Sequence, residues 1–176
     1  MRIEVFSHSD HETKGMGKRI GRLLEAGDVV CLYGELGSGK TTLTKGLAKG
    51  LGVQSEDVVR SPSFVLIHRY QGRVPVDHVD LFRLDVPGSL DDVGVRDLLG
   101  GDGVVIVEWA ERLGDLLPRE RLDITLHYSD EVDTRQITLH PQGARHTRLL
   151  EPWQAQVSDT HVGPPHGDKH ILGAIR

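Results

Sequence analysis

Residues 29–42, VVCLYGELGSGKTT, decide the fold that the sequence predicts. The run Val29–Leu32 is apolar without interruption, which is typical of a strand buried on both faces of a parallel sheet. It leads into Gly34–Thr41, which matches the P-loop pattern G-x-x-x-x-G-K-[ST], and a helix is expected from about Lys40 to Leu51. A strand, a glycine-rich loop and a helix in this order indicate a phosphate-binding loop.

The residue types of this loop suit the binding of a nucleotide. Glycines permit positive φ and let backbone N–H groups converge on phosphate oxygens, and the N-terminus of the next helix adds partial positive charge. Lys40 is expected to reach the β- and γ-phosphates, and the Thr41 hydroxyl to ligate Mg²⁺. The predicted nucleotide-binding residues of the loop are consecutive: Leu36, Gly37, Ser38, Gly39, Lys40, Thr41 and Thr42.

The rest of the chain alternates between strand and helix patterns. Further strands are predicted over residues 2–6, 64–70, 74–82, 104–107, 122–128 and 134–140, and further helices from Ser9, from Ser89 and over residues 144–150. Short turns separate two pairs of these strands, which indicates hairpins. We therefore predict an α/β fold whose sheet combines a parallel core with antiparallel strands.

Two carboxylates are candidates for the side opposite the phosphates, where a P-loop protein fixes Mg²⁺ and orients water. Glu108 ends an apolar strand and would face the crevice at the carboxyl edge of a parallel sheet; the alternative is a helix cap. Asp80 shares one face of its strand with His78 by alternation, and its alternative is a surface acid. His78 is a catalytic base or a hydrogen-bonded structural residue. Trp109 either stacks on a base or a partner, or packs in the core.

Composition and charge narrow the class of protein. The chain has 176 residues, one cysteine and a net charge of −5, so an internal disulfide and a cysteine-based metal site are excluded. Residues 77–133 hold 15 acidic and 5 basic residues. This argues against a self-sufficient nucleic-acid binder and fits a surface for a basic partner, metal-holding carboxylates or a solvated face. No membrane-spanning or signal-like run is found, so a soluble, cytoplasmic protein without membrane contact is expected.

The length suits one domain, which we place at residues 1–150. Residues 151–176 contain prolines, scattered glycines and three histidines without an apolar period, and we expect a flexible C-terminal tail there.

Four motifs, in this order, resemble the TsaE (YjeE) family, bacterial P-loop ATPases required for threonylcarbamoyladenosine modification of tRNA. They are GELGSGKTT at 34–42, SPSF at 61–64, HVDLFR at 78–83 and EWAE at 108–111. The first is generic, whereas the other three at these spacings are specific to that family. The resemblance covers the chain from about residue 5 to residue 150.

The resemblance implies a P-loop NTPase-like three-layer sandwich with a mixed parallel and antiparallel sheet, in agreement with the strands and hairpins above. It also implies an ATP hydrolase that uses ATP and Mg²⁺, is weak alone and is stimulated by the TsaB–TsaD complex. Such a protein binds and resets that complex between rounds of modification of the adenosine next to the anticodon. Its contact with tRNA is indirect, through the complex.

By position, the resemblance implies roles for the catalytic set Lys40, Asp80 and Glu108. Lys40 would contact phosphates, and Thr41 and Glu108 would hold the metal. Asp80 would lie by the γ-phosphate and help with the metal or the attacking water.

The resemblance further implies that Trp109 lies near the nucleotide, that Thr13 lies near the adenine and that residues 61–64 form a switch-like loop. Two positions depart from the family pattern. Ser63 replaces a threonine and keeps its hydroxyl, whereas Phe82 replaces a tyrosine and loses any hydrogen bond from that position.

Two other classes of function stay open. A P-loop small-molecule kinase would normally carry a compact arginine-rich lid. Here the candidate arginines are spread over two predicted strands and a loop: Arg60, Arg69, Arg73 and Arg83. A non-hydrolysing nucleotide sensor would only change its affinity for a partner.

Overall fold

The computed structural model describes residues 1–54, 59, 67–83 and 94–159, with side chains as far as Trp153. A seven-stranded sheet has the order β1-β7-β6-β2-β5-β4-β3. Its strands are β1 (Ile3–Ser7), β2 (Val29–Tyr33), β3 (Ile67–Gln71), β4 (Pro75–Asp80), β5 (Val104–Glu108), β6 (Arg121–Tyr128) and β7 (Arg135–Gln142). None of the helices in the described part of the chain has the length and apolar character needed to cross a membrane.

The sheet has a parallel centre and antiparallel edges, as the sequence predicts. β2 pairs in parallel with both β5 and β6, and β5 pairs in parallel with β4. Both predicted hairpins are present, β3 with β4 and β6 with β7, and β1 adds to β7 in the antiparallel sense. The four central strands therefore end at one edge of the sheet, where ligands bind in open α/β folds.

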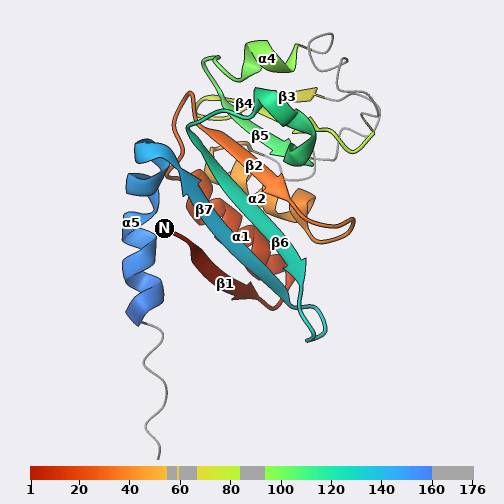
Figure 1. Cartoon of the computed structure of the whole chain (residues 1–176), viewed down its shortest axis with the longest axis vertical. Coiled ribbons are helices and arrows are strands. Elements are labelled where there is room, and N and C mark those ends of the chain that lie inside the picture. Colours follow the sequence, from red (N-terminus) through yellow and green to blue (C-terminus); the bar gives the residue numbers. More distant parts are fainter. Residues whose placement is uncertain (55–58, 60–66, 84–93, 160–176) are drawn as a thin grey trace, which may run out of the picture.

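Helices cover the two faces of the sheet unequally, which gives three layers (Figure 1). One face packs against α1 (Asp10–Gly21), α2 (Lys40–Gly50) and α5 (Gly143–Asp159). The other face packs, over β2, β5 and β4, against the short helices α4 (Val95–Leu98) and η2 (Ala110–Leu116). β2 is buried on both sides because successive side chains enter opposite cores, Val30 and Leu32 one, Val29 and Cys31 the other.

The first helix begins where the sequence predicts, after a capping serine. The Ser9 side chain accepts a hydrogen bond of 3.2 Å from the Glu12 N–H, as an N-cap does. The helix stops at Gly21, and Leu24, beyond its end, is still buried in the core. The helix predicted from Ser89 begins outside the described residues, and α4 is described from Val95.

Glycines let α1 and α2 pack backbone against backbone. A Cβ added to Gly17 would meet the Leu43 carbonyl oxygen at 2.5 Å, and one added to Gly46 would clash with the Lys14 carbonyl oxygen. Gly50 is blocked in the same way by Lys18. Because Lys14 faces Gly46 and Lys18 faces Gly50, the two helices run in the same direction and begin at the same edge of the sheet.

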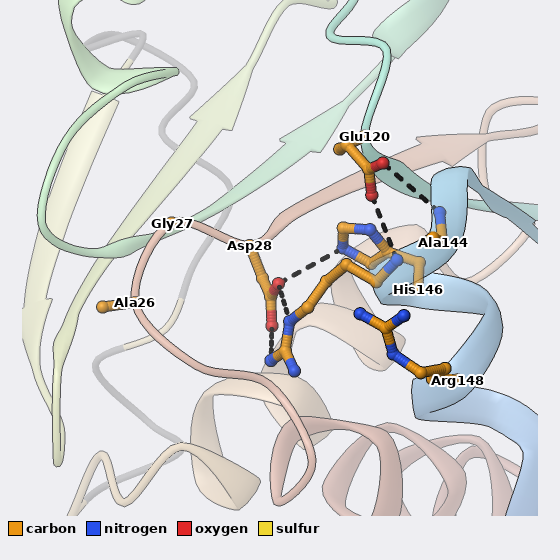
Figure 2. Close-up of a pocket in the computed structure, with 8 residues that line it drawn as sticks. Ala26, Gly27, Asp28, Glu120, Ala144, His146 and Arg148 are labelled. Carbon is orange, nitrogen blue, oxygen red and sulfur yellow. Dashed lines mark hydrogen bonds and ion pairs between the residues drawn. The ribbon is translucent and has the colours of Figure 1, made fainter.

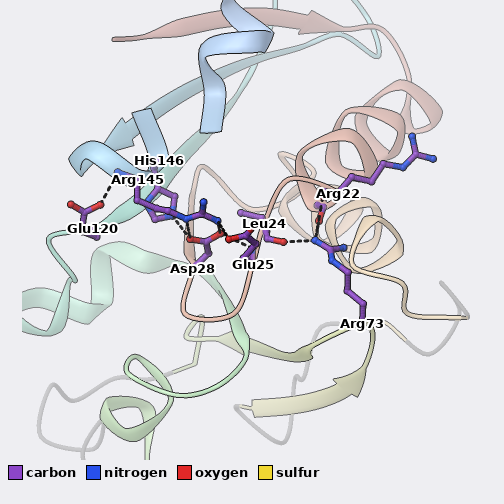
Figure 3. A network of polar contacts seen from close by, with 9 residues as sticks. Arg22, Leu24, Glu25, Asp28, Arg73, Glu120, Arg145 and His146 are labelled. Carbon is purple, nitrogen blue, oxygen red and sulfur yellow. Dashed lines mark hydrogen bonds and ion pairs between the residues drawn. The ribbon is translucent and has the colours of Figure 1, made fainter. Parts of the chain in front are cut away.

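Arg73, in the turn between β3 and β4, binds the C-terminal ends of α1 and α2 (Figure 3). Its guanidinium donates to the carbonyl oxygens of Gly50 at 2.8 Å and Gly21 at 3.0 Å, and also to that of Leu24. A cation at two helix C-termini complements both helix dipoles and satisfies carbonyl groups that the helices leave unpaired.

The C-terminal helix extends beyond the domain boundary expected after residue 150. α5 continues to Asp159, and Trp153 is buried with the Arg19 guanidinium 4.4 Å from its ring centroid. Residues 151–159, which the sequence assigned to a flexible tail, thus continue the helix, and the Trp153 ring packs against α1. The remainder of the expected tail, residues 160–176, lies outside the described residues.

The start of α5 is joined to the chain before β2 around an open pocket (Figure 2). Arg145 forms a two-pronged ion pair with Asp28, at 3.1 and 2.9 Å, and the Glu120 carboxylate accepts the N–H groups of Ala144 and Arg145. His146 is 1% exposed; its Nε2 lies 3.5 Å from Asp28 Oδ1 (Figure 2), and neither ring nitrogen makes a hydrogen bond among the described residues.

Because this imidazole is buried, we expect the free energy of unfolding of the protein to fall at mildly acidic pH. Burial lowers the pKa of His146 below its ordinary 6.5, and the nearby Asp28 carboxylate opposes the shift only in part. The other charged groups acting on the ring are Arg145, which lowers the pKa, and Glu120 and Asp123, which raise it. Below about pH 6.5 the unfolded chain therefore binds a proton that the folded chain resists, so stability is lost as pH falls toward the folded pKa.

Replacing the imidazole tests this expectation. His146→Leu should lose less unfolding free energy than the wild type when the pH is lowered from 7.5 to 5.5, as measured by urea denaturation. His127→Leu, which removes an exposed imidazole from β6, is the control and should follow the wild type. Parallel pH profiles for the wild type and His146→Leu would contradict the expectation.

Candidate functional site

The structure brings the predicted P-loop and both predicted carboxylates to one edge of the sheet. The loop joins the end of β2 to the start of α2. Asp80 and Glu108, the last residues of β4 and β5, are register partners on adjacent parallel strands. As alternation predicts, Val79 and Leu81 enter the core on the face opposite the α2 side. The site is therefore built by three segments that end or begin at the carboxyl edge of the parallel strands.

Lys40 is held inside the loop. Its Nζ donates to the carbonyl oxygens of Gly34 at 2.7 Å and Glu35 at 2.8 Å, and lies 3.9 Å from the centroid of the Trp109 ring. Burial lowers the pKa of Lys40, and three nearby carboxylates oppose this effect. The ammonium is thus fixed by the loop that it would serve, over an aromatic face that favours a cation.

The loop requires glycine for two separate reasons. Gly34, Gly37 and Gly39 have φ of 139°, 77° and 104°, a region that favours glycine. In addition, a Cβ at Gly34 would collide with the carbonyl oxygen of Leu126, and one at Gly37 would lie 2.6 Å from the hydroxyl of Tyr128. The loop therefore packs closely against the end of β6 as well as adopting the backbone shape of a phosphate cradle.

Tyr128 fixes one peptide of this cradle. Its hydroxyl donates to the Leu36 carbonyl oxygen at 2.9 Å, and the Arg135 guanidinium lies 4.7 Å from its ring centroid. Because a trans peptide is planar with its C=O and N–H on opposite sides, holding the Leu36 oxygen also fixes the direction of the Gly37 N–H. Tyr128 thereby orients a backbone donor of the loop.

Glu108 joins β5 to the first turn of α2 and to β4. The carboxylate is 2% exposed and accepts hydrogen bonds from Thr41 Oγ1 to Oε2 at 2.9 Å and from Thr44 Oγ1 to Oε1 at 3.1 Å. His78 Nε2, on β4, lies 2.9 Å from Oε1. These contacts make Glu108 a part of the P-loop site rather than a helix cap.

Asp80 lies next to an aromatic pair formed by Phe82 and Trp109. Asp80 is 6% exposed, and its Oδ1 accepts the Phe82 N–H at 3.0 Å. The rings of Phe82 and Trp109 are 4.9 Å apart between centroids. Trp109 adopts the left-handed conformation, with φ 60° and ψ 45°, which is rare for a bulky residue and turns its ring over Lys40.

The remaining predicted residues occupy different environments. Leu36 is exposed at the tip of the loop, and Thr42 is half-buried in the first turn of α2. Ser38 is buried, and its Oγ has no partner among the described residues. Thr13 is buried at the same edge, with its Oγ1 2.7 Å from Ser7 Oγ. The predicted switch-like loop, residues 61–64, lies outside the described residues.

The donor chemistry of the site suits Mg²⁺. Thr41 and Glu108 supply hydroxyl and carboxylate oxygens, which are the ligands that this cation prefers. Across the described residues no group of three or more His, Cys, Asp or Glu side chains could hold a metal by itself. A site with few protein ligands fits a cation that is completed by phosphate oxygens and water.

Three features of this site were not predicted from the sequence: the roles of Thr44 and Tyr128, and the hydrogen bond between His78 and Glu108. Thr44 lies three residues after Thr41, on the same helix face, so helical spacing could have identified it. Tyr128 could not be found this way, because only the parallel pairing of β6 with β2 brings it to the loop. The hydrogen bond between His78 and Glu108 likewise depends on the pairing of β4 with β5.

Comparison with known proteins points to one family. The family model described as "Threonylcarbamoyl adenosine biosynthesis protein TsaE" matches residues 7–137. The tRNA threonylcarbamoyladenosine biosynthesis protein TsaE of Bacillus subtilis (strain 168) is 40% identical over 141 residues, which is 80% of this chain and 86% of the relative. The Treponema pallidum (strain Nichols) protein of the same name is 41% identical over 137 residues, 78% of this chain and 99% of the relative. The crystal structure of Bacillus subtilis YdiB superposes with a TM-score of 0.71 and 33% identity, and the match covers 89% of this chain and 97% of that one.

The Tyr128 contact predicts a measurable change in the loop. Tyr128→Phe removes only the hydroxyl, so the peptide between Leu36 and Gly37 loses one hydrogen bond, worth about 1 kcal/mol. Amide hydrogen exchange of residues 36–39 should accelerate by roughly twofold to tenfold. Tyr70→Phe, on β3, is the control and should leave this exchange unchanged. Equal loop exchange in Tyr128→Phe and the wild type would contradict the assignment.

Proposed function

This chain belongs to the TsaE family of threonylcarbamoyl adenosine biosynthesis proteins, and we propose that it is a Mg²⁺-dependent ATP hydrolase serving this modification of tRNA. In this proposal it acts by binding and resetting the TsaB–TsaD complex, through which its contact with tRNA is indirect. The observation that carries the ATPase proposal is the hydrogen bond of 2.9 Å from the P-loop Thr41 to the strand-end carboxylate Glu108. It joins the phosphate cradle to a metal-binding group.

In this proposal Lys40 and the loop backbone bind the phosphates. The Nζ of Lys40 exchanges its two carbonyl acceptors for β- and γ-phosphate oxygens, while the start of α2 contributes the positive end of its dipole. The residues proposed to line the nucleotide are those predicted from the sequence, with Trp109 beside Lys40 and Thr13 on the adenine side.

Thr41 and Glu108 are the proposed metal-binding pair. Since the Thr41 hydroxyl donates its hydrogen to Glu108, the lone pairs of its oxygen are directed away from that carboxylate and are available to a cation. When bound, Mg²⁺ would neutralise negative charge that develops on the phosphate oxygens.

Asp80 is proposed to orient the attacking water. It ends the strand next to Glu108, and the Phe82 N–H holds one of its carboxylate oxygens. His78 is not suited to act as the base, because its side chain is fully buried and its Nε2 is engaged by Glu108. Positioning and charge stabilisation account for most of the catalysis of phosphoryl transfer, so no separate base is required.

The acidic middle of the sequence offers the first surface to test for partner docking. Part of it lies exposed on α4, on η2 and in the turn between α4 and β5, where four acidic side chains face solvent: Asp97, Asp102, Glu111 and Asp115. Such a surface suits a basic partner and accelerates association at low salt.

The lysine of the loop gives the most direct binding test. Lys40→Ala should weaken ATP binding by roughly tenfold to a hundredfold in isothermal titration calorimetry, because a charge-assisted bond to phosphate is lost. Lys45→Ala, on the same helix beyond the loop, is the matched control. Unchanged affinity in Lys40→Ala would contradict the phosphate role of the loop.

The two carboxylates are tested by turnover, alone and with purified TsaB and TsaD from the same organism. The wild type should hydrolyse ATP slowly by itself and much faster with both partners. Glu108→Gln and Asp80→Asn, which preserve side-chain shape, should each lower the stimulated rate by about a hundredfold or more while changing unfolding free energy far less. Full activity in both variants would refute the assigned carboxylates, and an unstimulated wild type would refute the partner role.

A further inference from the structure

The oxygens of Glu108 are not equally available. A carboxylate oxygen accepts about two hydrogen bonds. Oε1 lies 2.9 Å from His78 Nε2 and 3.1 Å from Thr44 Oγ1, whose single hydrogen is shared with the Lys40 carbonyl oxygen at 3.0 Å. His78 is therefore the full donor to Oε1, and Thr44 a shared one. Oε2 takes one, from Thr41 Oγ1 at 2.9 Å, and keeps acceptor capacity on the side of the P-loop. The contacts on Oε1 thus decide which oxygen of Glu108 can serve a ligand.

His78 is built into this arrangement as a donor. It is fully buried on β4, directly opposite Ile106 in the pairing with β5. An ionised carboxylate only accepts hydrogen bonds, so the bond to Glu108 places a proton on Nε2. Nδ1 has no partner among the residues that the structure describes. A purely structural role would more easily be met by an apolar side chain, because an unpaired buried nitrogen costs free energy.

We propose that His78 is a positioning residue that, with Thr44, occupies Oε1 of Glu108 and thereby directs Oε2 and the Thr41 hydroxyl toward Mg²⁺. The inference rests on the proposed nucleotide and metal binding and adds to it which atom of Glu108 is used and what sets it. Without His78 the carboxylate can rotate about its last bond, and the acceptor offered to the cation is no longer fixed. The phosphate cradle itself, made by the loop backbone and Lys40, does not involve His78.

Separating metal-dependent from metal-independent binding tests the proposal. ADP affinity is measured by calorimetry with and without Mg²⁺ in the wild type, His78→Leu and His78→Gln. His78→Leu should bind ADP without Mg²⁺ as tightly as the wild type does. With Mg²⁺ present, its ADP affinity should be about tenfold lower than that of the wild type. His78→Gln, whose amide N–H₂ can replace the Nε2 donor, should retain most of the gain. His68→Leu, on the neighbouring strand β3, is the matched control.

The outcomes separate this proposal from the one on which it rests. A wild type that binds no nucleotide, or gains nothing from Mg²⁺, would overturn the proposed function. A wild type with the Mg²⁺ gain and a His78→Leu variant that keeps it would overturn the positioning role alone. Loss of metal-free binding in His78→Leu would also overturn that role, since it would indicate a general structural effect.

The tautomer of His78 provides a second, independent readout. Nitrogen-15 NMR of the imidazole in the folded wild type should show a protonated Nε2 and an unprotonated Nδ1 near neutral pH. In Glu108→Gln, whose side chain stays neutral, the Nε2 signal should move most among the histidines. The opposite tautomer, with the proton on Nδ1, would contradict the donor role.

Discussion

The hydrogen bond from Thr41 to Glu108 joins the first turn of α2 to the end of β5, and the rest of the site is organised around it. The carboxylate is buried, so each of its acceptor positions must be filled by a protein group or a ligand. Thr41 and Thr44 on α2 and His78 on β4 contact it, and Oε2 keeps acceptor capacity for a ligand. These two elements are adjacent only because the sheet places β4 beside β5 and the P-loop leads from β2 into α2. A buried charge held by three donors is preorganised, and preorganisation is the main contribution a P-loop protein makes to phosphoryl transfer.

The close packing of the α1 backbone against the α2 backbone stabilises the position of α2, which carries Thr41 and Thr44. Glycines on α1 and α2 allow a close approach that any side chain would prevent, so the start of α2 is fixed relative to the sheet. Arg73 holds the other end of both helices by their terminal carbonyl groups. At the loop itself, the backbone at the end of β6 leaves no room for a side chain at Gly34, and Tyr128 lies close to Gly37. The phosphate cradle is therefore shaped from outside by its neighbours as well as by its own sequence.

The sequence was sufficient for elements whose signals are local. The apolar strand, the glycine-rich loop and the capped first helix were all predicted, as were both hairpins and the strand-end position of Glu108. Contacts made by distant segments were not, because parallel pairing leaves no local pattern: Tyr128 reaches the loop only through β6. The left-handed backbone of Trp109 and the length of α5 were missed for the same reason, since tertiary packing outweighs local preference there. The nucleotide-binding and metal-binding roles of the site residues stay predictions, because they follow from the chemistry of the side chains and not from their positions in the fold.

In the proposed function, the P-loop and Glu108 form one preorganised site for a Mg²⁺–nucleotide. A crystal structure with Mg²⁺ and a non-hydrolysable ATP analogue tests it most directly. In that structure the triphosphate should lie along residues 36–42, with Lys40 released from the carbonyl groups of the loop and bound to phosphate oxygens. Mg²⁺ should lie at the Thr41 hydroxyl on the Oε2 side of Glu108, with the hydrogen bond from His78 to Oε1 retained. A cation placed away from Thr41, or a Glu108 carboxylate that has left His78 and turned Oε1 toward the metal, would contradict it.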